Sequence, residues 1–271
     1  MLKLNFSKND KMRKRVFWWE PKDGIHNAGD HLAKVIVQQM LTLRDKEILD
    51  KESSKNKLLS IGSVMHFANE GDCIWGTGVN GKISLDKLNF TNLDVRAVRG
   101  PKTRKVLQDK GINVPEIYGD PALLLPSLFD KKILIDENLK TEILVIPHMN
   151  EDIRKYDKYS SVLCSPRQGA LSFTRRIVNS SFVVSSSLHG VIIAEAYGIP
   201  AVFLDGESGE SMFKYDDYYN GTGRDYYPVA RNIDQAFKLE QAKPINMDDI
   251  VPKLFNAFPY ELWGIKHSKD C

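Results

Sequence analysis

The sequence predicts an α/β protein made of two halves that face each other across a cleft. Three observations predict this class. Short apolar runs alternate with longer amphipathic segments, an alternation that favours parallel sheets covered by helices on both faces. Glycine and polar residues gather where the apolar runs end. The segment 125–140, with a proline and a charged run, interrupts the alternation near the middle of the 271 residues, and this length suffices for two domains of ~100–150 residues each.

In the first half, the apolar runs have the length of buried strands. We expect strands at residues 15–19, 58–61, 73–75, 95–98 and 116–118. The segment 30–43 is expected to be a helix, because its apolar residues recur every three or four positions, at Leu32, Val35, Ile36, Met40 and Leu41. Another helix is expected to begin at Pro101, since the missing N–H of proline costs nothing in the first turn.

The second half repeats this alternation. We expect strands at residues 142–146, 161–163, 182–185 and 201–204, and helices at residues 168–179, 190–197, 233–241 and 248–258. The chain then divides into an N-terminal Rossmann-like domain, residues 1–130, and a C-terminal Rossmann-like domain, residues 131–271, which includes the C-terminal helix. In such sheets ligands bind at the carboxyl ends of the strands.

Composition disfavours several classes of protein. The 38 basic and 35 acidic residues leave a net charge of +3, which is too small to argue for a nucleic-acid partner. No apolar run reaches the ~18 residues of a membrane helix, and the basic start lacks the apolar region of a secretory signal. Three scattered cysteines fit reduced thiols in a cytosolic protein, and their spacing predicts no metal site. The complete P-loop pattern, GxxxxGK[ST], does not occur, which disfavours ordinary ATP chemistry.

Polar residues follow two of the strands expected in the first half. Asn27, Gly29 and Asp30 stand where the first strand leads into a helix, whose free N–H groups attract an anion or a hydroxyl. Arg99 follows the strand 95–98 and offers the cleft a planar fork suited to carboxylate or phosphate. The alternative for each is an ordinary turn or an exposed side chain.

His189 stands at a similar junction in the second half. It follows the strand 182–185 and the hydroxyl residues Ser186 and Ser187, and it precedes Gly190 and a helix. An imidazole at the mouth of a cleft can donate or accept a proton near neutral pH, and the serines can cap the helix or bind a ligand oxygen. The alternative is a histidine packed in the core.

The segment FKYDDYYNGTGR, after the last expected strand of the second half, is dense in aromatic and charged residues. Tyr215, Tyr218 and Tyr219 suit a sugar, which has apolar faces and polar edges. Lys214 and Arg224 suit an anion. The alternative is a solvated loop whose tyrosines pack on the surface.

Together these motifs resemble the polysaccharide pyruvyl transferase family. The matching pieces come in the family's order, with NAGD at 27–30, RGP at 99–101, GDP at 119–121, SSLHG at 186–190 and EAYGIP at 195–200. They span most of the chain, and the ordered set is more specific than any single piece. The tyrosine-rich segment after them looks like the branch that decorates bacterial exopolysaccharides.

The resemblance implies a fold like that of the two-domain GT-B glycosyltransferases, with the acceptor on the N-terminal side and the donor on the C-terminal side. It implies phosphoenolpyruvate as donor, no cofactor, and a glycan or lipid-linked glycan as acceptor. The product would be a pyruvate ketal bridging two hydroxyls of one sugar. It also implies a cytoplasmic enzyme, in peripheral contact with the inner face of the cytoplasmic membrane where the acceptor is lipid-linked.

The resemblance also implies residue roles. Family members use the histidine that matches His189 in acid catalysis and the arginine that matches Arg99 at the donor. The chemistry of the reaction, rather than the resemblance, calls for a base, and Asp30 or Asp217 could take the hydroxyl proton of the sugar. The expected donor site consists of Arg99, Ser186, Ser187, His189, Gly190, Lys214 and Arg224, and the expected acceptor site of Asn27, Gly29, Asp30, Tyr215, Tyr218 and Tyr219.

Two departures from the family pattern concern positive charge. Many members have an arginine where Ser187 stands and a lysine where Gly209 stands. Lys214 and Arg224 are our candidates to supply the missing charge. Two other classes stay open, a GT-B glycosyltransferase that uses a sugar nucleotide and a non-catalytic glycan-binding module.

Overall fold

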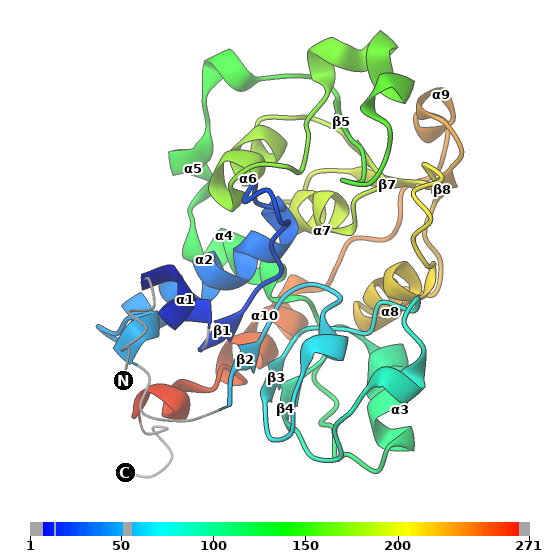
Figure 1. Ribbon diagram of the computed structural model, residues 1–271. Helices are drawn as coiled ribbons and strands as arrows, with labels where there is room; N and C mark the ends of the chain where they lie inside the picture. Colours follow the sequence, from blue (N-terminus) through cyan, green and yellow to red (C-terminus); the bar gives the residue numbers. More distant parts are fainter. Residues whose placement is uncertain (1–7, 14, 51–55, 266–271) are drawn as a thin grey trace.

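The computed structural model describes residues 8–13, 15–50 and 56–265. Within these ranges the strands form two four-stranded parallel sheets, each in the order of the chain (Figure 1). The first sheet consists of β1 (Val16–Phe17), β2 (Leu58–Leu59), β3 (Cys73–Trp75) and β4 (Asp94–Ala97). The second consists of β5 (Leu144–Ile146), β6 (Val183–Ser185), β7 (Ala201–Leu204) and β8 (Val229–Ala230). The chain is therefore an α/β protein with a parallel sheet in each half.

Helices and short 3₁₀ turns connect the strands. Up to the second sheet they are α1 (Lys8–Arg13), α2 (Ala28–Thr42), η1 (Ile48–Asp50), η2 (Met65–Phe67), η3 (Leu85–Lys87), α3 (Pro101–Asp109), η4 (Pro121–Leu124), α4 (Leu125–Leu128), α5 (Lys131–Leu134) and η5 (Glu137–Leu139). After the first strand of the second sheet they are η6 (Ile153–Val162), α6 (Ala170–Val178), α7 (Leu188–Ala196), α8 (Phe213–Gly221), α9 (Ile233–Ala236), α10 (Met247–Asn256) and η7 (Tyr260–Trp263).

Most of the expected strands and helices are present, and the exceptions have local causes. The expected strands 116–118 and 161–163 are reduced to single parallel bridges, Tyr118 with Val98 and Leu163 with Val145. Pro115 precedes the first and lacks a donor N–H, and the helix η6 runs into the second.

Helix α8 corrects the interpretation of the tyrosine-rich segment as a sugar-binding connection. Tyr215, Tyr218 and Tyr219 are buried, and their spacing of three and four residues places them on one face of a helix. Sequence reasoning weighed only the chemistry of these rings and not their helical period.

The C-terminal helix α10 packs on the first half, although the division at residue 130 assigns it to the second. Trp75 of β3 donates from Nε1 to the carbonyl of Leu254 at 2.9 Å, and its ring lies edge-on to Phe258 with centroids 4.9 Å apart. Farther on, Trp263 donates to the carbonyl of Ile48. The chain therefore returns to the first sheet after it completes the second.

One continuous apolar core runs through both halves. It includes Val16 and Trp75 of the first sheet and Val183 of the second. Helix α2 lies between the halves, against β1 on one side and α6 on the other (Figure 1). The start of α2, at Ala28, is thereby brought to the boundary between the two sheets.

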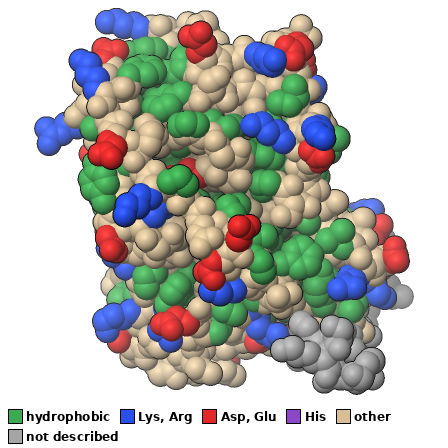
Figure 2. All heavy atoms as spheres, turned by 180° about the vertical axis from the view of Figure 1, so that it is seen from behind, with side chains coloured by type: hydrophobic (Ala, Val, Ile, Leu, Met, Phe, Trp, Pro, Cys, Tyr) green, Lys and Arg blue, Asp and Glu red, His purple; other side chains and the backbone are tan. Residues whose placement is uncertain are grey.

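The surface has no single sign of charge on the face shown in Figure 2, where acidic and basic side chains are interspersed. Among the described residues, none of the helices has the length and apolar character needed to cross a membrane.

A buried ion pair joins α3 and α8. Arg99 and Asp217 are both fully buried, with Nη2 and Oδ2 3.0 Å apart. Asp217 also accepts hydrogen bonds from the backbone N–H and the hydroxyl of Thr103. Gly100 lies so close to the backbone of Asp217 that a β-carbon at this position would overlap it. Both charges are thus committed to holding the two halves together.

We expect Asp217→Asn to lower the free energy of unfolding by about 3–5 kcal/mol, because it leaves Arg99 buried without a counter-charge. Urea denaturation measures the change. The matched control is Asp109→Asn, which breaks an exposed pair with Lys105 and should change stability by less than ~0.5 kcal/mol. Equal transition midpoints for the two variants would contradict a structural role for the buried pair.

Candidate active site

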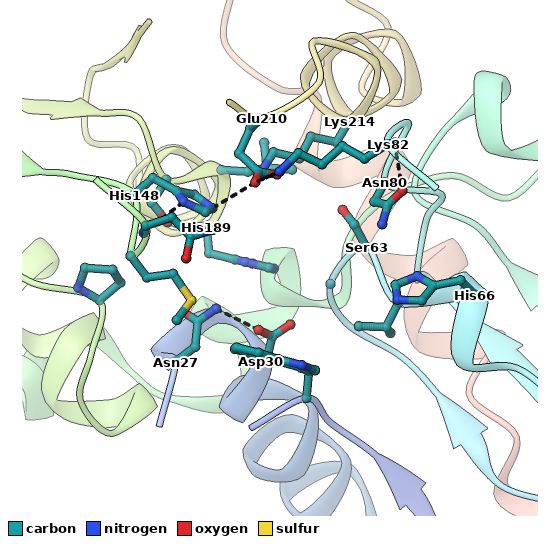
Figure 3. Close-up of a pocket in the computed structure, with 18 of the residues that line it drawn as sticks. Asn27, Asp30, Ser63, His66, Asn80, Lys82, His148, His189, Glu210 and Lys214 are labelled. Carbon is teal, nitrogen blue, oxygen red and sulfur yellow. Dashed lines mark hydrogen bonds and ion pairs between the residues drawn. The ribbon is translucent and has the colours of Figure 1, made fainter. Parts of the chain in front are cut away.

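A cavity of about 300 Å³ lies between the two halves (Figure 3). Its polar lining follows the carboxyl ends of strands from both sheets, where parallel α/β sheets bind ligands. The first half contributes Asn27, Asp30, Ser63, His66, Asn80 and Lys82, and the second contributes His148, Asn150, Ser187, His189, Glu210 and Lys214. Trp19 and Phe67 add an aromatic surface on the side of the first half.

Asp30 enters the cavity from the first turn of α2. Only 9% of its surface is exposed, and Asn27 donates to its Oδ2 at 2.6 Å. Burial raises the pKa of the Asp30 carboxyl to about 6, although His189, the Asn27 hydrogen bond and Lys214 oppose the rise. A carboxyl with this pKa can accept a proton near neutral pH.

His189 enters the same cavity from the first turn of α7. Its ring lies against α2 so closely that a β-carbon on Gly29 would overlap it. Its Nε2 is 3.4 Å from Oδ2 of Asp120, which belongs to the first half. The two halves therefore meet at this histidine, and they bring Asp30 and His189 into one cavity.

Two lysines share one carboxylate on the opposite wall (Figure 3). Glu210 pairs with Lys214 of α8 at 2.8 Å and also with Lys82 of the first half. Burial favours a higher pKa for Glu210, but its two lysine partners outweigh that effect and hold the pKa at about 2. Burial lowers the pKa of Lys214, although the ion pair with Glu210 opposes this decrease.

His148 lies beside this pair, with Nε2 3.9 Å from Glu210. Burial and, to a smaller extent, the charge of Lys214 lower the pKa of His148 to about 4, although Glu210 opposes the decrease. The imidazole is therefore neutral at pH 7 and can donate or accept hydrogen bonds without adding charge.

The structure brings together some of the residues expected from the sequence. Asn27, Asp30, Ser187, His189 and Lys214 line the cavity. Gly29 lies immediately behind the lining, where its lack of a side chain admits the His189 ring.

Ser186 and Gly190 lie behind the wall of the cavity. The backbone N–H of His148 donates to the Ser186 hydroxyl at 2.8 Å, and Gly190 packs against Ser185. Both positions support the turn between β6 and α7 and do not line the cavity.

Two arginines expected at the donor are held by carboxylates instead. Arg99 is buried and forms an ion pair with Asp217. It approaches the cavity only through Nη1, which donates to the hydroxyl of Ser63 at 2.6 Å. Arg224 forms two hydrogen bonds to Glu195, at 2.7 and 2.9 Å, and lines a separate cavity beneath residues 241–247. The expected base Asp217 has no access to the first cavity, because Arg99 and Thr103 enclose its carboxylate.

The three tyrosines expected at the acceptor also lie outside the cavity lining. Tyr215 donates to the carbonyl of Ser186 at 2.6 Å, Tyr218 donates to Glu195 at 2.6 Å, and Tyr219 stacks on Tyr227. Their rings fill the core under α8, so the structure assigns them to packing.

Several cavity residues were not expected from the sequence. His148 follows the strand β5 by two positions, so its place at a strand end was a usable signal. Lys82 and Glu210 stand in irregular segments, and only the fold pairs them. Trp19 lies within the expected strand 15–19, but β1 ends at Phe17 and Trp19 follows it.

Residues 27–208 match the family described as polysaccharide pyruvyl transferase. A succinoglycan biosynthesis protein, ExoV, of Rhizobium meliloti (strain 1021) is 25% identical over 224 residues, which cover 79% of this chain and 66% of that protein. An uncharacterized protein, L143, of Acanthamoeba polyphaga mimivirus is 26% identical over 218 residues, which cover 74% and 73% of the two chains.

The family match spans the polar turns of both halves. It begins at Asn27 and ends at Ser208, so it includes Asp30 and His189, whereas Lys214 lies beyond it. The match covers more than half of the sequence. The chain therefore belongs to the polysaccharide pyruvyl transferase family.

Proposed function

We propose that this protein transfers the enolpyruvyl group of phosphoenolpyruvate to two hydroxyls of one sugar, forms a pyruvate ketal and releases phosphate. The acceptor is a bacterial surface polysaccharide or exopolysaccharide, or its lipid-linked precursor. Family membership and the relative named for succinoglycan biosynthesis support this assignment. The observation that carries it is the position of His189, in a cavity that also contains a buried carboxyl, Asp30, and a pair of lysines.

The donor binds on the lysine wall. Phosphoenolpyruvate carries a phosphate and a carboxylate, so it needs at least two cationic contacts. Lys82 and Lys214 supply them, and Glu210, which bridges both lysines, occupies the place of the donor's anionic groups. Binding then exchanges one carboxylate for the charged groups of the donor, and Arg224 takes no part because it is paired with Glu195.

His189 and Asp30 divide the proton transfers. His189 gives a proton to the methylene carbon of the donor, which becomes a methyl group, and the central carbon becomes electrophilic. A sugar hydroxyl adds to this carbon and loses its proton to Asp30. Phosphate then leaves with the C–O bonding electrons, and a second hydroxyl of the same sugar closes the ketal and releases its proton. Such assistance by a positioned acid and base contributes about 10²–10⁴-fold each.

The sugar lies on the aromatic side of the cavity. Trp19 and Phe67 offer apolar surface to the face of a sugar ring. Asn27 and Asn80, which line the same cavity, have amide groups that can hydrogen-bond to ring hydroxyls. In this proposal the acceptor lies on the N-terminal side and the donor mainly on the C-terminal side, with Lys82 reaching it from the first half, as in the facing domains of GT-B glycosyltransferases. We propose that this arrangement functions on the cytoplasmic side of the membrane.

The direct test is release of phosphate from phosphoenolpyruvate with a panel of lipid-linked sugars. We expect release that depends on both substrates, with no turnover of sugar nucleotides. His189→Gln should keep donor affinity and lose about 10²-fold or more in turnover, because an amide cannot deliver a proton. Hydrolysis or transfer of a sugar nucleotide by the wild-type protein would reject the proposal in favour of a glycosyltransferase.

Asp30→Asn should lose activity and gain stability at neutral pH. Burial raises the pKa of Asp30 from 3.8 to about 6, so folding favours the protonated carboxyl. Its contribution to stability is complete below pH ~4 and is lost as the pH rises through about 6, a cost of ~3 kcal/mol at pH 7. An asparagine removes that cost and can still accept the Asn27 hydrogen bond.

Urea denaturation at pH 4.5 and pH 7.5 measures the change for Asp30→Asn. The stabilisation relative to wild type should be larger at pH 7.5, while turnover falls by about 10²-fold or more. An Asp86→Asn control, at an exposed carboxyl, should leave turnover unchanged. Wild-type turnover in Asp30→Asn would exclude Asp30 as the base.

A further inference from the structure

The side chain of Asp120, close to the candidate active site, has a buried oxygen whose role the site described above does not explain. Asp120 follows Gly119 and begins the short helix η4, where its Oδ1 accepts a hydrogen bond from the backbone N–H of Ala122 at 2.9 Å. Its other oxygen, Oδ2, is buried without a hydrogen-bond partner among the described residues. A buried carboxylate oxygen without a partner is costly, so the place where this atom points requires an explanation.

The explanation is the ring of His189. Within the part of the chain that the structure describes, its Nε2 is also buried without a hydrogen-bond partner, and it lies 3.4 Å from Oδ2 of Asp120. Each of these two atoms is therefore the natural partner of the other, slightly beyond the ideal hydrogen-bond distance. Asp120 itself has an exposure of 0% and does not line the cavity, so it cannot reach a substrate.

The residues around the His189 ring indicate how a hydrogen bond from Nε2 to Asp120 would affect the ring. The missing side chain of Gly29 leaves room for Nδ1 of the ring, where a β-carbon would otherwise lie, and His189 borders the cavity together with Asp30 and Asn27. Because Nε2 is enclosed, Nδ1 is the ring nitrogen that remains for the cavity. A carboxylate can only accept a hydrogen bond, so it fixes the tautomer that carries its hydrogen on Nε2.

We propose that Asp120 is a positioning residue for His189. Its carboxylate holds the hydrogen on Nε2 and keeps Nδ1 directed toward the donor. Nδ1 then takes up a proton from solvent and delivers it to the methylene carbon of phosphoenolpyruvate, after which the ring returns to the neutral form with its hydrogen still on Nε2. This inference rests on the proposed function for the identity of the proton acceptor, but the contact between Asp120 and His189 does not depend on it.

Asp120→Asn tests the inference sharply, because an asparagine can keep the cap and reverse the hydrogen bond. Its carbonyl would accept from Ala122, and its NH₂ group would then point at Nε2 of His189. A donor at this place selects the opposite tautomer, with hydrogen on Nδ1. The same change in a serine-protease triad leaves the geometry intact and lowers turnover by about 10⁴-fold.

Long-range ¹H–¹⁵N NMR of protein labelled at its histidines reports the tautomer. The signals of His189 are assigned because they are missing from the spectrum of the His189→Gln variant. The wild type should carry hydrogen on Nε2 in the neutral form, and Asp120→Asn should shift it to Nδ1. Turnover of phosphoenolpyruvate should fall by about 10²-fold or more, the range for loss of a positioned acid, with its KM changed by less than about threefold.

Asp130→Asn is the matched control. Asp130 caps helix α5 through the same contact, from its Oδ1 to the backbone N–H of Lys132 at 2.9 Å, but it is exposed. Its substitution should change neither the tautomer nor turnover. Hydrogen on Nδ1 in the wild type, or normal turnover in Asp120→Asn, would overturn the proposal. If the wild type releases no phosphate at all, the proposed function fails, and the NMR result still decides whether Asp120 sets the tautomer.

Discussion

The site depends on one close contact, the packing of the first turn of α2 against the ring of His189. There is no room for a β-carbon at Gly29, so the backbone of the first half touches the imidazole of the second. This contact brings Asp30 into the same cavity as His189, and Asp120 approaches the far nitrogen of the ring from the first half. The buried pair of Arg99 and Asp217 holds the halves together at α3 and α8. Neither half alone contains Asp30, His189 and both lysines of the cavity.

The charges of the cavity are arranged at a cost to stability. Burial disfavours the ionised carboxyl of Asp30 and the charged ammonium of Lys214, and Glu210 relieves only the second of these. Active sites commonly keep such groups because a substrate compensates them. An anionic donor would neutralise the lysines in place of Glu210.

Sequence reasoning located the strand ends well, because short apolar runs between amphipathic segments have a clear periodicity. That was sufficient to single out Asp30 and His189, which follow β1 and β6. Arg99 is expected at the donor because it follows a strand end and matches the family's arginine. Its partner Asp217 is 118 residues away, and no local pattern encodes such a pairing. Sequence reasoning assigned the tyrosines of α8 to a sugar because side-chain chemistry was weighed above the three- and four-residue spacing that buries them. The return of α10 to the first sheet depends on tertiary contacts of Trp75 and Phe258. These contacts join residues far apart in the sequence, so no local sequence pattern predicts them.

A crystal structure with phosphoenolpyruvate tests the central claim most directly, namely that the donor binds at the meeting point of the two halves. The account predicts the phosphate and carboxylate within hydrogen-bond distance of Lys82 and Lys214, Glu210 displaced from both lysines, and the methylene carbon beside the ring of His189. Donor bound instead at the second cavity, next to Arg224, would contradict it, as would donor in the first cavity with its methylene carbon turned away from His189.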